Sequence, residues 1–387
     1  MTRAIALAVV VLIACLGVSA AQATGTQPTG TQPAGNGPTA AARAWLVENP
    51  VTGEILAEHD ARRRVPIASI TKLMTVLVAL EHLKLTDVVR VDPRAAAVGQ
   101  ESIYLRAGQE ISVADLVKGA MIQSANDAAD ALALATAPSF AAFAVLMNEK
   151  AGELGLTDSH FVRPDGLDAP GEYSSARDVT NLALDAMKIP AVRSAVDEIE
   201  DRIEDGTVGL HTWDDLLGVM PGIFGVKTGH TSDAGWNQVS AIRGGGTTIY
   251  ATILGSPSRA RRNADLETLL SYGLAQYREV DAISVGRDYA DVKLPYGKAQ
   301  LALVARSPFR TVARVDKPIT ERVVAPVALN LPVQRGEVLG HVEVWSGGKL
   351  LGRRPLVAAR TVRVPGLTGR VGWYARRTVH DLAGLVT

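Results

Sequence analysis

Three short motifs along the chain carry the side chains of a serine nucleophile, a general base and an anion-binding cation. In chain order they are Ser69-Ile70-Thr71-Lys72, Ser124-Ala125-Asn126 and Lys227-Thr228-Gly229. Residues three apart on a helix share a face, so the amine of Lys72 should lie beside the hydroxyl of Ser69. A serine hydroxyl is a weak nucleophile until a base takes its proton. The first motif therefore predicts acyl transfer through a covalent serine intermediate, with Lys72 as the base.

The other two motifs could supply what this chemistry needs. A lysine acts as a base when burial or a neighbouring cation lowers its pKa, and Lys227 could provide that cation. A helix that begins at Ser69 would offer free N–H groups to the oxyanion of a tetrahedral intermediate. Each motif alone is weak, because a serine at a helix start is usually an N-cap. Their order along one chain is what favours a catalytic site.

The composition argues against several other classes of function. The chain has 387 residues, of which 47% are hydrophobic and 21% charged, as in folded globular proteins. Lys+Arg and Asp+Glu are both 40, so nothing indicates nucleic acid as a partner. The single cysteine rules out an intramolecular disulfide, and the seven histidines form no metal-binding pair. We therefore expect neither a metal nor a cofactor.

Residues 1–39 indicate export followed by a tether. Residues 1–23 combine Arg3, an apolar run over residues 4–18 and the small-residue site Ala21-Gln22-Ala23, which is typical of a cleaved signal peptide. The stretch LIAC at residues 12–15 also resembles a lipoprotein box, which would instead lipidate Cys15. Residues 24–39 hold TGTQP twice and no large apolar residue, so we expect a disordered linker. Both alternatives place the protein in the extracytoplasmic cell envelope.

The elements that must position the motifs follow from the hydrophobic periodicity. Residues 69–83 have helical spacing, which places Ser69 and Lys72 at the start of a helix. Further helices are expected at residues 113–121, 127–137, 140–154, 176–187 and 265–277. Strands are expected at residues 44–48, 54–58, 223–227, 237–243 and 247–254. Helices combined with late antiparallel strands predict a layered α+β domain over residues 40–279.

The C-terminal part changes in character near residue 280. Alternating runs at residues 300–305, 310–315 and 339–345 are broken by glycine and proline, which predicts a small all-β sandwich over residues 280–367. Residues 368–387 predict an amphipathic helix whose apolar stripe lies opposite Arg376, Arg377, His380 and Asp381. Such a helix could bind an anionic membrane surface or dock on the β-rich domain.

With these elements in place, the sequence resembles the low-molecular-mass penicillin-binding proteins, which are serine D-alanyl-D-alanine carboxypeptidases. The likeness spans residues 40–365 and extends well beyond the three motifs. Four stretches carry it: VPIASITKLMT at residues 65–75, SANDAA at 124–129, FVRPDGLDAPGEYSSARD at 161–178, and GVKTGHT at 225–231 followed by Ala234-Gly235.

This resemblance implies both a fold and an activity. The fold would be a β-lactamase/transpeptidase-like domain, an antiparallel sheet with helices. The chain would remove the terminal D-alanine from peptidoglycan pentapeptides through an acyl-enzyme on Ser69, and β-lactam antibiotics would inhibit it. Lys72 would be the base, while Ser124 and Asn126 would complete the proton network. The residues that would bind the substrate and its carboxylate are Lys227, Thr228, Gly229 and His230.

His230 has two possible roles, and the sequence departs from the family pattern at two places. The resemblance places the second oxyanion donor on the backbone N–H of His230, whose side chain would border the substrate carboxylate or lie solvated on its strand. Asp165 stands where some family members have histidine. The segment Trp213-Asp214-Asp215-Leu216-Leu217 lacks the asparagine that commonly precedes the Leu-Leu pair, which could alter substrate preference.

Three alternatives share parts of this pattern. A class A β-lactamase would need an ExxLN loop, and none occurs between residues 161 and 178. A D,D-endopeptidase of the same family would cut peptidoglycan crosslinks, and the motifs do not separate it from a carboxypeptidase. A catalytically silent cell-wall-binding module would not require Ser69 and Lys72 to be intact, so their presence argues for an enzyme.

Overall fold

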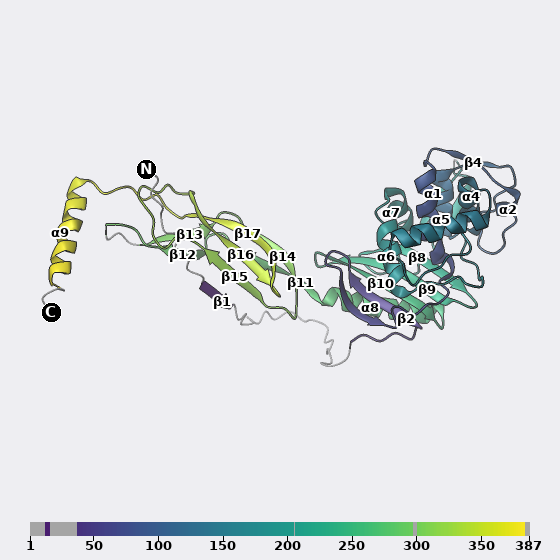
Figure 1. Ribbon diagram of the computed structural model, residues 1–387, viewed down its shortest axis with the longest axis horizontal. Coiled ribbons are helices and arrows are strands. Elements are labelled where there is room, and N and C mark those ends of the chain that lie inside the picture. Colours follow the sequence, from purple (N-terminus) through teal and green to yellow (C-terminus); the bar gives the residue numbers. More distant parts are fainter. Residues whose placement is uncertain (1–11, 16–36, 205, 297–299, 384–387) are drawn as a thin grey trace. The chain divides into compact units, whose positions relative to one another are not determined.

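The computed structural model describes residues 12–15, 37–204, 206–296 and 300–383 (Figure 1). The chain divides into two compact units: the first covers residues 31–276, and the second combines residues 277–387 with residues from the start of the chain. Most of the predicted signal peptide and linker lies outside the described residues. Within the predicted signal peptide, the short strand β1 (Leu12–Cys15) is described, and it pairs with a strand of the second unit.

The first unit is built on a five-stranded antiparallel sheet in the order β3-β2-β10-β9-β8. Its strands are β2 (Ala44–Asn49), β3 (Glu54–His59), β8 (Ile223–Thr231), β9 (Gly235–Gly244) and β10 (Thr247–Ser256). The two early strands join the three late ones through the pairing of β2 with β10. The strand β8 lies at an edge of the sheet, and the short 3-10 helix η1 (Ala68–Thr71) packs against it.

Helices cover both faces of this sheet. Gly273 of α8 (Arg259–Ala275) lies against Ile249 of β10, whereas Thr180 of α6 (Ala176–Ala186) hydrogen-bonds Thr252 of the same strand. Ile249 and Thr252 are three residues apart, so their side chains point to opposite faces of the sheet. The sheet is therefore the middle layer of the unit.

The helix α1 (Lys72–His82) forms the centre of the remaining helical layer, where it packs against α6, α4 (Asn126–Thr136) and α5 (Phe140–Glu153). Every residue from Lys72 to Ala79 is buried. A helix that is apolar on nearly all sides belongs in a core. The amine of Lys72, the first residue of α1, is therefore buried in protein.

Several elements differ from those expected. The helix α8 begins at Arg259 rather than near residue 265, because the Ser258 hydroxyl caps it by accepting a hydrogen bond from the N–H of Arg261. The α-helix α3 (Val113–Lys118) is shorter than expected and continues as a π-helical turn, η2 (Gly119–Gln123). Two short helices and two small two-stranded sheets had not been expected: α2 (Pro93–Ala96), α7 (Pro190–Val196), β4 (Val88–Arg90) with β5 (Glu110–Ser112), and β6 (Glu200–Ile203) with β7 (Val208–His211).

The second unit is made of strands. A six-stranded sheet has the order β1-β15-β16-β17-β13-β12, and β11 pairs with β14. These strands are β11 (Tyr277–Ile283), β12 (Asp288–Val292), β13 (Leu301–Ala305), β14 (Phe309–Arg314), β15 (Ile319–Val324), β16 (Val338–Ser346) and β17 (Lys349–Ala358). Alternate residues of β13 and β16 form its own apolar core. The expected α+β domain followed by an all-β domain is confirmed.

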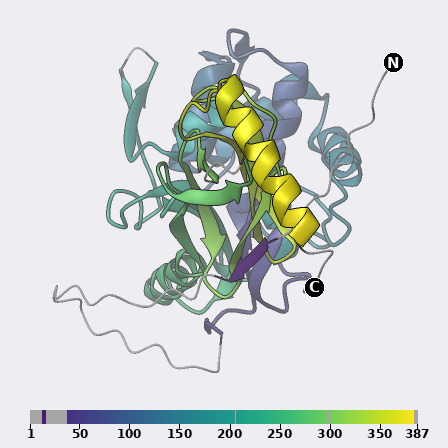
Figure 2. The ribbon, with the colours of Figure 1, turned by 90° about the vertical axis from the view of Figure 1, so that its left-hand side faces the viewer.

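The helix α9 (Leu367–Ala383) follows the second unit's strands and is drawn in yellow in Figures 1 and 2. Within the described residues, no single helix has the length and apolar character needed to cross a membrane. One bent pair, α4 with α5, meets the criterion by length and composition alone.

Candidate active site

The first motif occupies the junction between η1 (Ala68–Thr71) and α1. Ser69 lies in the 3-10 turn, one residue after Ala68, whose φ of 52° is in the left-handed region that non-glycine residues rarely adopt. Lys72 opens α1, and its Nζ lies 2.7 Å from Ser69 Oγ. Two other oxygens surround the same amine, Asn126 Oδ1 at 2.8 Å and the Asp165 carbonyl at 2.6 Å.

The second motif brings two polar groups to the same place. Ser124 ends the π-helical turn η2 with a φ of 61°, and Asn126 begins α4. Asn126 Nδ2 donates to the carbonyl of Gly99 at 2.9 Å, which orients its amide oxygen toward Lys72. The positive φ of Ser124 is strained backbone, which costs about 1–3 kcal/mol and is commonly found at functional sites.

The third motif lies on the edge strand β8, directly beside η1. Lys227 Nζ donates to Ser124 Oγ at 2.8 Å and to the Thr228 carbonyl at 3.0 Å. A Cβ at Gly229 would lie 2.7 Å from the carbonyl oxygen of Ile67 and 3.0 Å from the Ser69 nitrogen. Only glycine therefore allows β8 to come this close to the turn that carries Ser69.

Burial sets the proton affinities of the two lysines. Burial lowers the pKa of Lys72 to about 8, against the opposing effect of the Asp165 and Asp130 carboxylates. Burial, followed by the charge of Lys72, holds the pKa of the Lys227 ammonium well below its usual range. Both amines thus lose protons more readily than a lysine in water, which a general base near neutral pH requires.

Three buried carboxyl groups, Asp130, Asp165 and Glu172, act electrostatically on Lys72. Burial, reinforced by the Asp165 carboxylate, raises the pKa of Asp130 to about 8, and Asp130 Oδ1 has no hydrogen-bond partner among the described residues. Burial also raises the pKa of Glu172 to about 7, although Thr71 donates to it. The side chain of Asp165 accepts two hydrogen bonds from Arg163, so its backbone oxygen rather than its carboxylate contacts Lys72.

A cavity of about 170 Å³ opens at the nucleophile. Five of the eight site residues expected from the three motifs and the family resemblance line it, and the other three, Lys72, Asn126 and Lys227, are buried behind its wall. The His230 ring lies against Trp236 with centroids 4.0 Å apart and the ring planes tilted by 30°. The lining consists of Ser69, Gln100, Glu101, Ser124, Trp213, Thr228, Gly229, His230, Trp236, Arg259 and Arg262.

Sequence reasoning missed five of these lining residues: Gln100, Glu101, Trp236, Arg259 and Arg262. Arg259 and Arg262 lie in the first turn of α8, which the expected helix start near residue 265 left out. Ser258, a favourable N-cap residue, was the signal that could have placed them. The other three carry no motif of their own, whereas Trp213 belongs to the segment that departs from the family pattern. No group of three or more histidine, cysteine, aspartate or glutamate residues suited to a metal ion occurs in the part of the chain that the structure describes.

The arrangement supports serine-based acyl transfer. The Ser69 hydroxyl lies beside a desolvated amine, and the Ser124 hydroxyl lies beside a second one. The cavity wall carries two guanidinium groups, which suit a carboxylate ligand. A substrate with a terminal carboxylate could thus present its nearest peptide carbonyl to Ser69.

Comparison with known proteins gives consistent results. Residues 29–258 match the family described as D-alanyl-D-alanine carboxypeptidase, and residues 277–364 match the penicillin-binding protein 5 C-terminal domain. The D-alanyl-D-alanine carboxypeptidase DacC of Escherichia coli is 32% identical, over 90% of this chain and 90% of that protein. DacF of Bacillus subtilis is 29% identical, over 88% of this chain and 90% of that protein.

Solved structures show the same fold. Penicillin-binding protein 5 from Haemophilus influenzae superposes with a TM-score of 0.60 at 26% identity, covering 87% of this chain and 100% of that one. A Streptomyces DD-transpeptidase gives a TM-score of 0.58 at 31% identity, covering 62% of this chain and 99% of that one. The expected transpeptidase-like fold is confirmed.

Proposed function

The chain belongs to the D-alanyl-D-alanine carboxypeptidase family, and we propose that it removes the terminal D-alanine of peptidoglycan stem peptides through an acyl-enzyme on Ser69. The family expected from the sequence is thereby confirmed. One observation carries the residue-level proposal: Lys72 Nζ is enclosed by Ser69 Oγ and two oxygens that can only accept hydrogen bonds.

These contacts support proton transfer from Ser69 to Lys72. A neutral amine has two N–H bonds and one lone pair. Its N–H bonds go to Asn126 Oδ1 and the Asp165 carbonyl, since neither oxygen can donate. The lone pair then faces Ser69 Oγ, 2.7 Å away, and accepts the hydroxyl proton. Lys72 is therefore the general base for acylation.

The reaction proceeds in two steps. Ser69 Oγ attacks the carbonyl carbon of the penultimate D-alanine, and its proton passes to Lys72. The C–N bond then breaks, and the proton held by Lys72 passes through the hydroxyl of Ser124, which Lys227 holds in place, to the amine of the leaving D-alanine. Water next attacks the ester on Ser69 and gives a proton to the neutral Lys72. That proton returns to Ser69 Oγ as the ester C–O bond breaks, which releases the shortened peptide and restores the hydroxyl. The backbone N–H groups of Ser69 and His230 stabilise the oxyanion in both steps.

The substrate carboxylate binds on the side of the cavity formed by the third motif. Thr228, Gly229 and His230 line that side, and Arg262 brings a fixed positive charge to it. A guanidinium remains protonated where a buried ammonium with a lowered pKa does not. Arg262 therefore supplies the carboxylate with a cation even when Lys227 is neutral.

The nucleophile can be tested with a β-lactam. Intact-mass measurement of the wild type should show one covalent adduct, which Ser69→Ala abolishes. Ser271→Ala, at an exposed position of α8, is the matched control and should retain the adduct. A persistent adduct in folded Ser69→Ala would refute the assignment. Incubation with a pentapeptide and with a crosslinked dimer distinguishes D-alanine release from crosslink cleavage.

Action on peptidoglycan places the protein outside the cytoplasm, and we further propose that residues 1–23 direct export and that α9 binds the membrane surface. Leu367 and Val371 are four residues apart on α9 and are 78% and 65% exposed, whereas Trp373 and Tyr374 contact the ring of Tyr296 in the second unit. The exposed apolar pair, with Arg370 nearby, supports binding to anionic lipid.

A further inference from the structure

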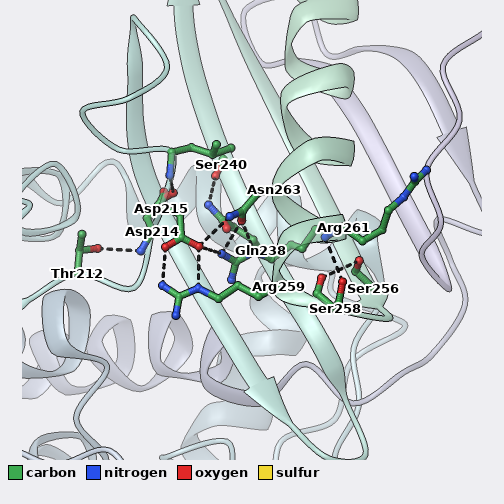
Figure 3. A network of polar contacts seen from close by, with 12 residues as sticks. Thr212, Asp214, Asp215, Gln238, Ser240, Ser256, Ser258, Arg259, Arg261 and Asn263 are labelled. Atoms are coloured by element: carbon green, nitrogen blue, oxygen red, sulfur yellow. Dashed lines mark hydrogen bonds and ion pairs between the residues drawn. The ribbon is translucent and has the colours of Figure 1, made fainter.

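Asp215 belongs to the segment that departs from the family pattern, and its carboxylate binds side chains at the start of α8. Asp215 accepts hydrogen bonds from Arg259 through both carboxylate oxygens, with Nε at 2.7 Å from Oδ2 (Figure 3). The same Oδ2 accepts from Arg262 Nη2 at 3.1 Å and from Asn263 Nδ2 at 2.8 Å. One carboxylate thus ties together three side chains from the first two turns of α8.

Both arginines lie in the wall of the active-site cavity, and Asp215 lies behind them. Arg259 and Arg262 line the cavity together with Ser69, whereas Asp215 does not. Each guanidinium also lies over a cavity tryptophan, Arg259 over Trp213 at 5.6 Å and Arg262 over Trp236 at 5.7 Å. Asp215 and the aromatic rings together restrict where the two positive charges can point.

The group formed by Asp215, Arg259 and Arg262 is cationic, and the cavity lining also contains the acidic residue Glu101. Two guanidinium groups share one aspartate, so the group of three carries a net charge of +1. Bonding to Asp215 and Asn263 occupies Nε and Nη2 of both arginines, and within the described residues neither Nη1 has a hydrogen-bond partner. Arg262 is 2% exposed, so its remaining donor acts in a partly desolvated place, where a bond to an anion is strong.

We propose that Asp215 is a positioning residue that holds Arg259 and Arg262 as one cationic wall, and that this wall selects substrates with a free carboxylate next to the scissile bond. The inference rests on the proposed function. Asp215 touches no substrate, and it acts by fixing two flexible side chains before the substrate arrives. Pre-organised donors bind without the entropic cost of ordering them.

Two acyl-D-alanyl thioesters test the idea, because activated leaving groups react readily with a serine enzyme. One ends in a free carboxylate beyond the scissile bond, and the other is its methyl ester. For Asp215→Asn we expect the KM for the carboxylate to rise about tenfold, as for the loss of one charge-assisted hydrogen bond. The kcat and the methyl-ester kinetics should stay within about twofold, well below that tenfold effect. The preference for the carboxylate should therefore fall about tenfold.

Asp158→Asn is the matched control. Asp158 also joins two arginines, Arg62 and Arg64, but none of the three lines the cavity. This variant should keep the wild-type preference for the carboxylate. A general loss of stability would affect both substrates alike, whereas loss of positioning affects only the charged one.

Arg259→Gln tests the same role of the cationic wall if Asp215→Asn does not fold. Arg259 is 39% exposed at its side chain, so Arg259→Gln should fold and should also lose carboxylate preference. An unchanged preference in the variants that fold overturns the inference. A wild type that hydrolyses neither thioester overturns the proposed function itself, which is a different result.

Discussion

At the scale of single residues, Lys72 is enclosed by three oxygens in a space without exposed surface. Its lowered pKa of about 8 predicts how the rate depends on pH. The base must be neutral to accept the Ser69 proton, so acylation by a β-lactam should rise as pH increases through about 8 and then level off. Stopped-flow acylation between pH 6 and pH 10 measures this, and a flat profile would contradict it.

A neighbouring carboxyl group provides a control for the assignment. Asp130, whose own pKa is about 8, is charged only in part at the midpoint of the profile and there raises the pKa of Lys72, so Asp130→Asn should move the midpoint slightly to lower pH. Lys72→Ala should instead lower the rate about 100-fold or more and remove the pH step, because general-base catalysis is worth at least that much. A step that persists in folded Lys72→Ala would assign the titration to another group.

Local spacing explains why the residues of the three motifs could be predicted and others could not. Ser69 and Lys72 are one helical turn apart, so their proximity follows from sequence alone. The third oxygen around Lys72 is a backbone carbonyl of Asp165, and a main-chain atom leaves no mark on residue type. Asp130 looks like any helix residue, since its burial depends on how α4 packs against α1.

At the scale of elements, the site depends on how closely strand β8 approaches the turn η1. A methyl group at position 229 would lie 2.7 Å from the Ile67 oxygen and 3.0 Å from the Ser69 nitrogen. Gly229→Ala should push β8 away from Ser69 and lower acylation about 100-fold, as a misplacement of about 1 Å can. Gly209→Ala is the matched control, because this strand glycine has open space around it. Near-normal acylation by a folded Gly229→Ala would contradict the prediction.

The residues at which elements begin and end are harder to predict from sequence than the elements themselves, and α8 shows why. Its first turn reads RARR, which has no apolar stripe, so periodicity placed the start near residue 265. The structure uses that polar turn to carry Arg259 and Arg262 into the cavity. The short sheets β4-β5 and β6-β7 were missed because three- and four-residue strands hold too few residues to show alternation.

At the scale of the whole molecule, the proposed chemistry and the proposed membrane attachment belong to different units. All eight residues proposed from the motifs precede Gln276, where the first unit ends. The Streptomyces DD-transpeptidase matches only 62% of this chain but 99% of its own length. A unit of this kind can therefore exist without the rest. Every residue that lines the cavity belongs to the first unit, and α9 follows the strands of the second unit along the chain.

The exposed apolar residues of α9 predict that it binds to an anionic membrane surface. Full-length protein should co-sediment with vesicles of anionic lipid, and a form ending at Pro365 should stay in solution. Val371, 65% exposed on α9, would enter the lipid, so Val371→Asp should weaken binding by placing a charge there. Val219→Asp introduces the same charge at a valine that is 74% exposed in the first unit, and it should leave binding unchanged. High salt should reduce binding, since the attraction of Arg370 to lipid headgroups is screened. Equal solubility of the full-length and shortened forms would show that α9 has another role.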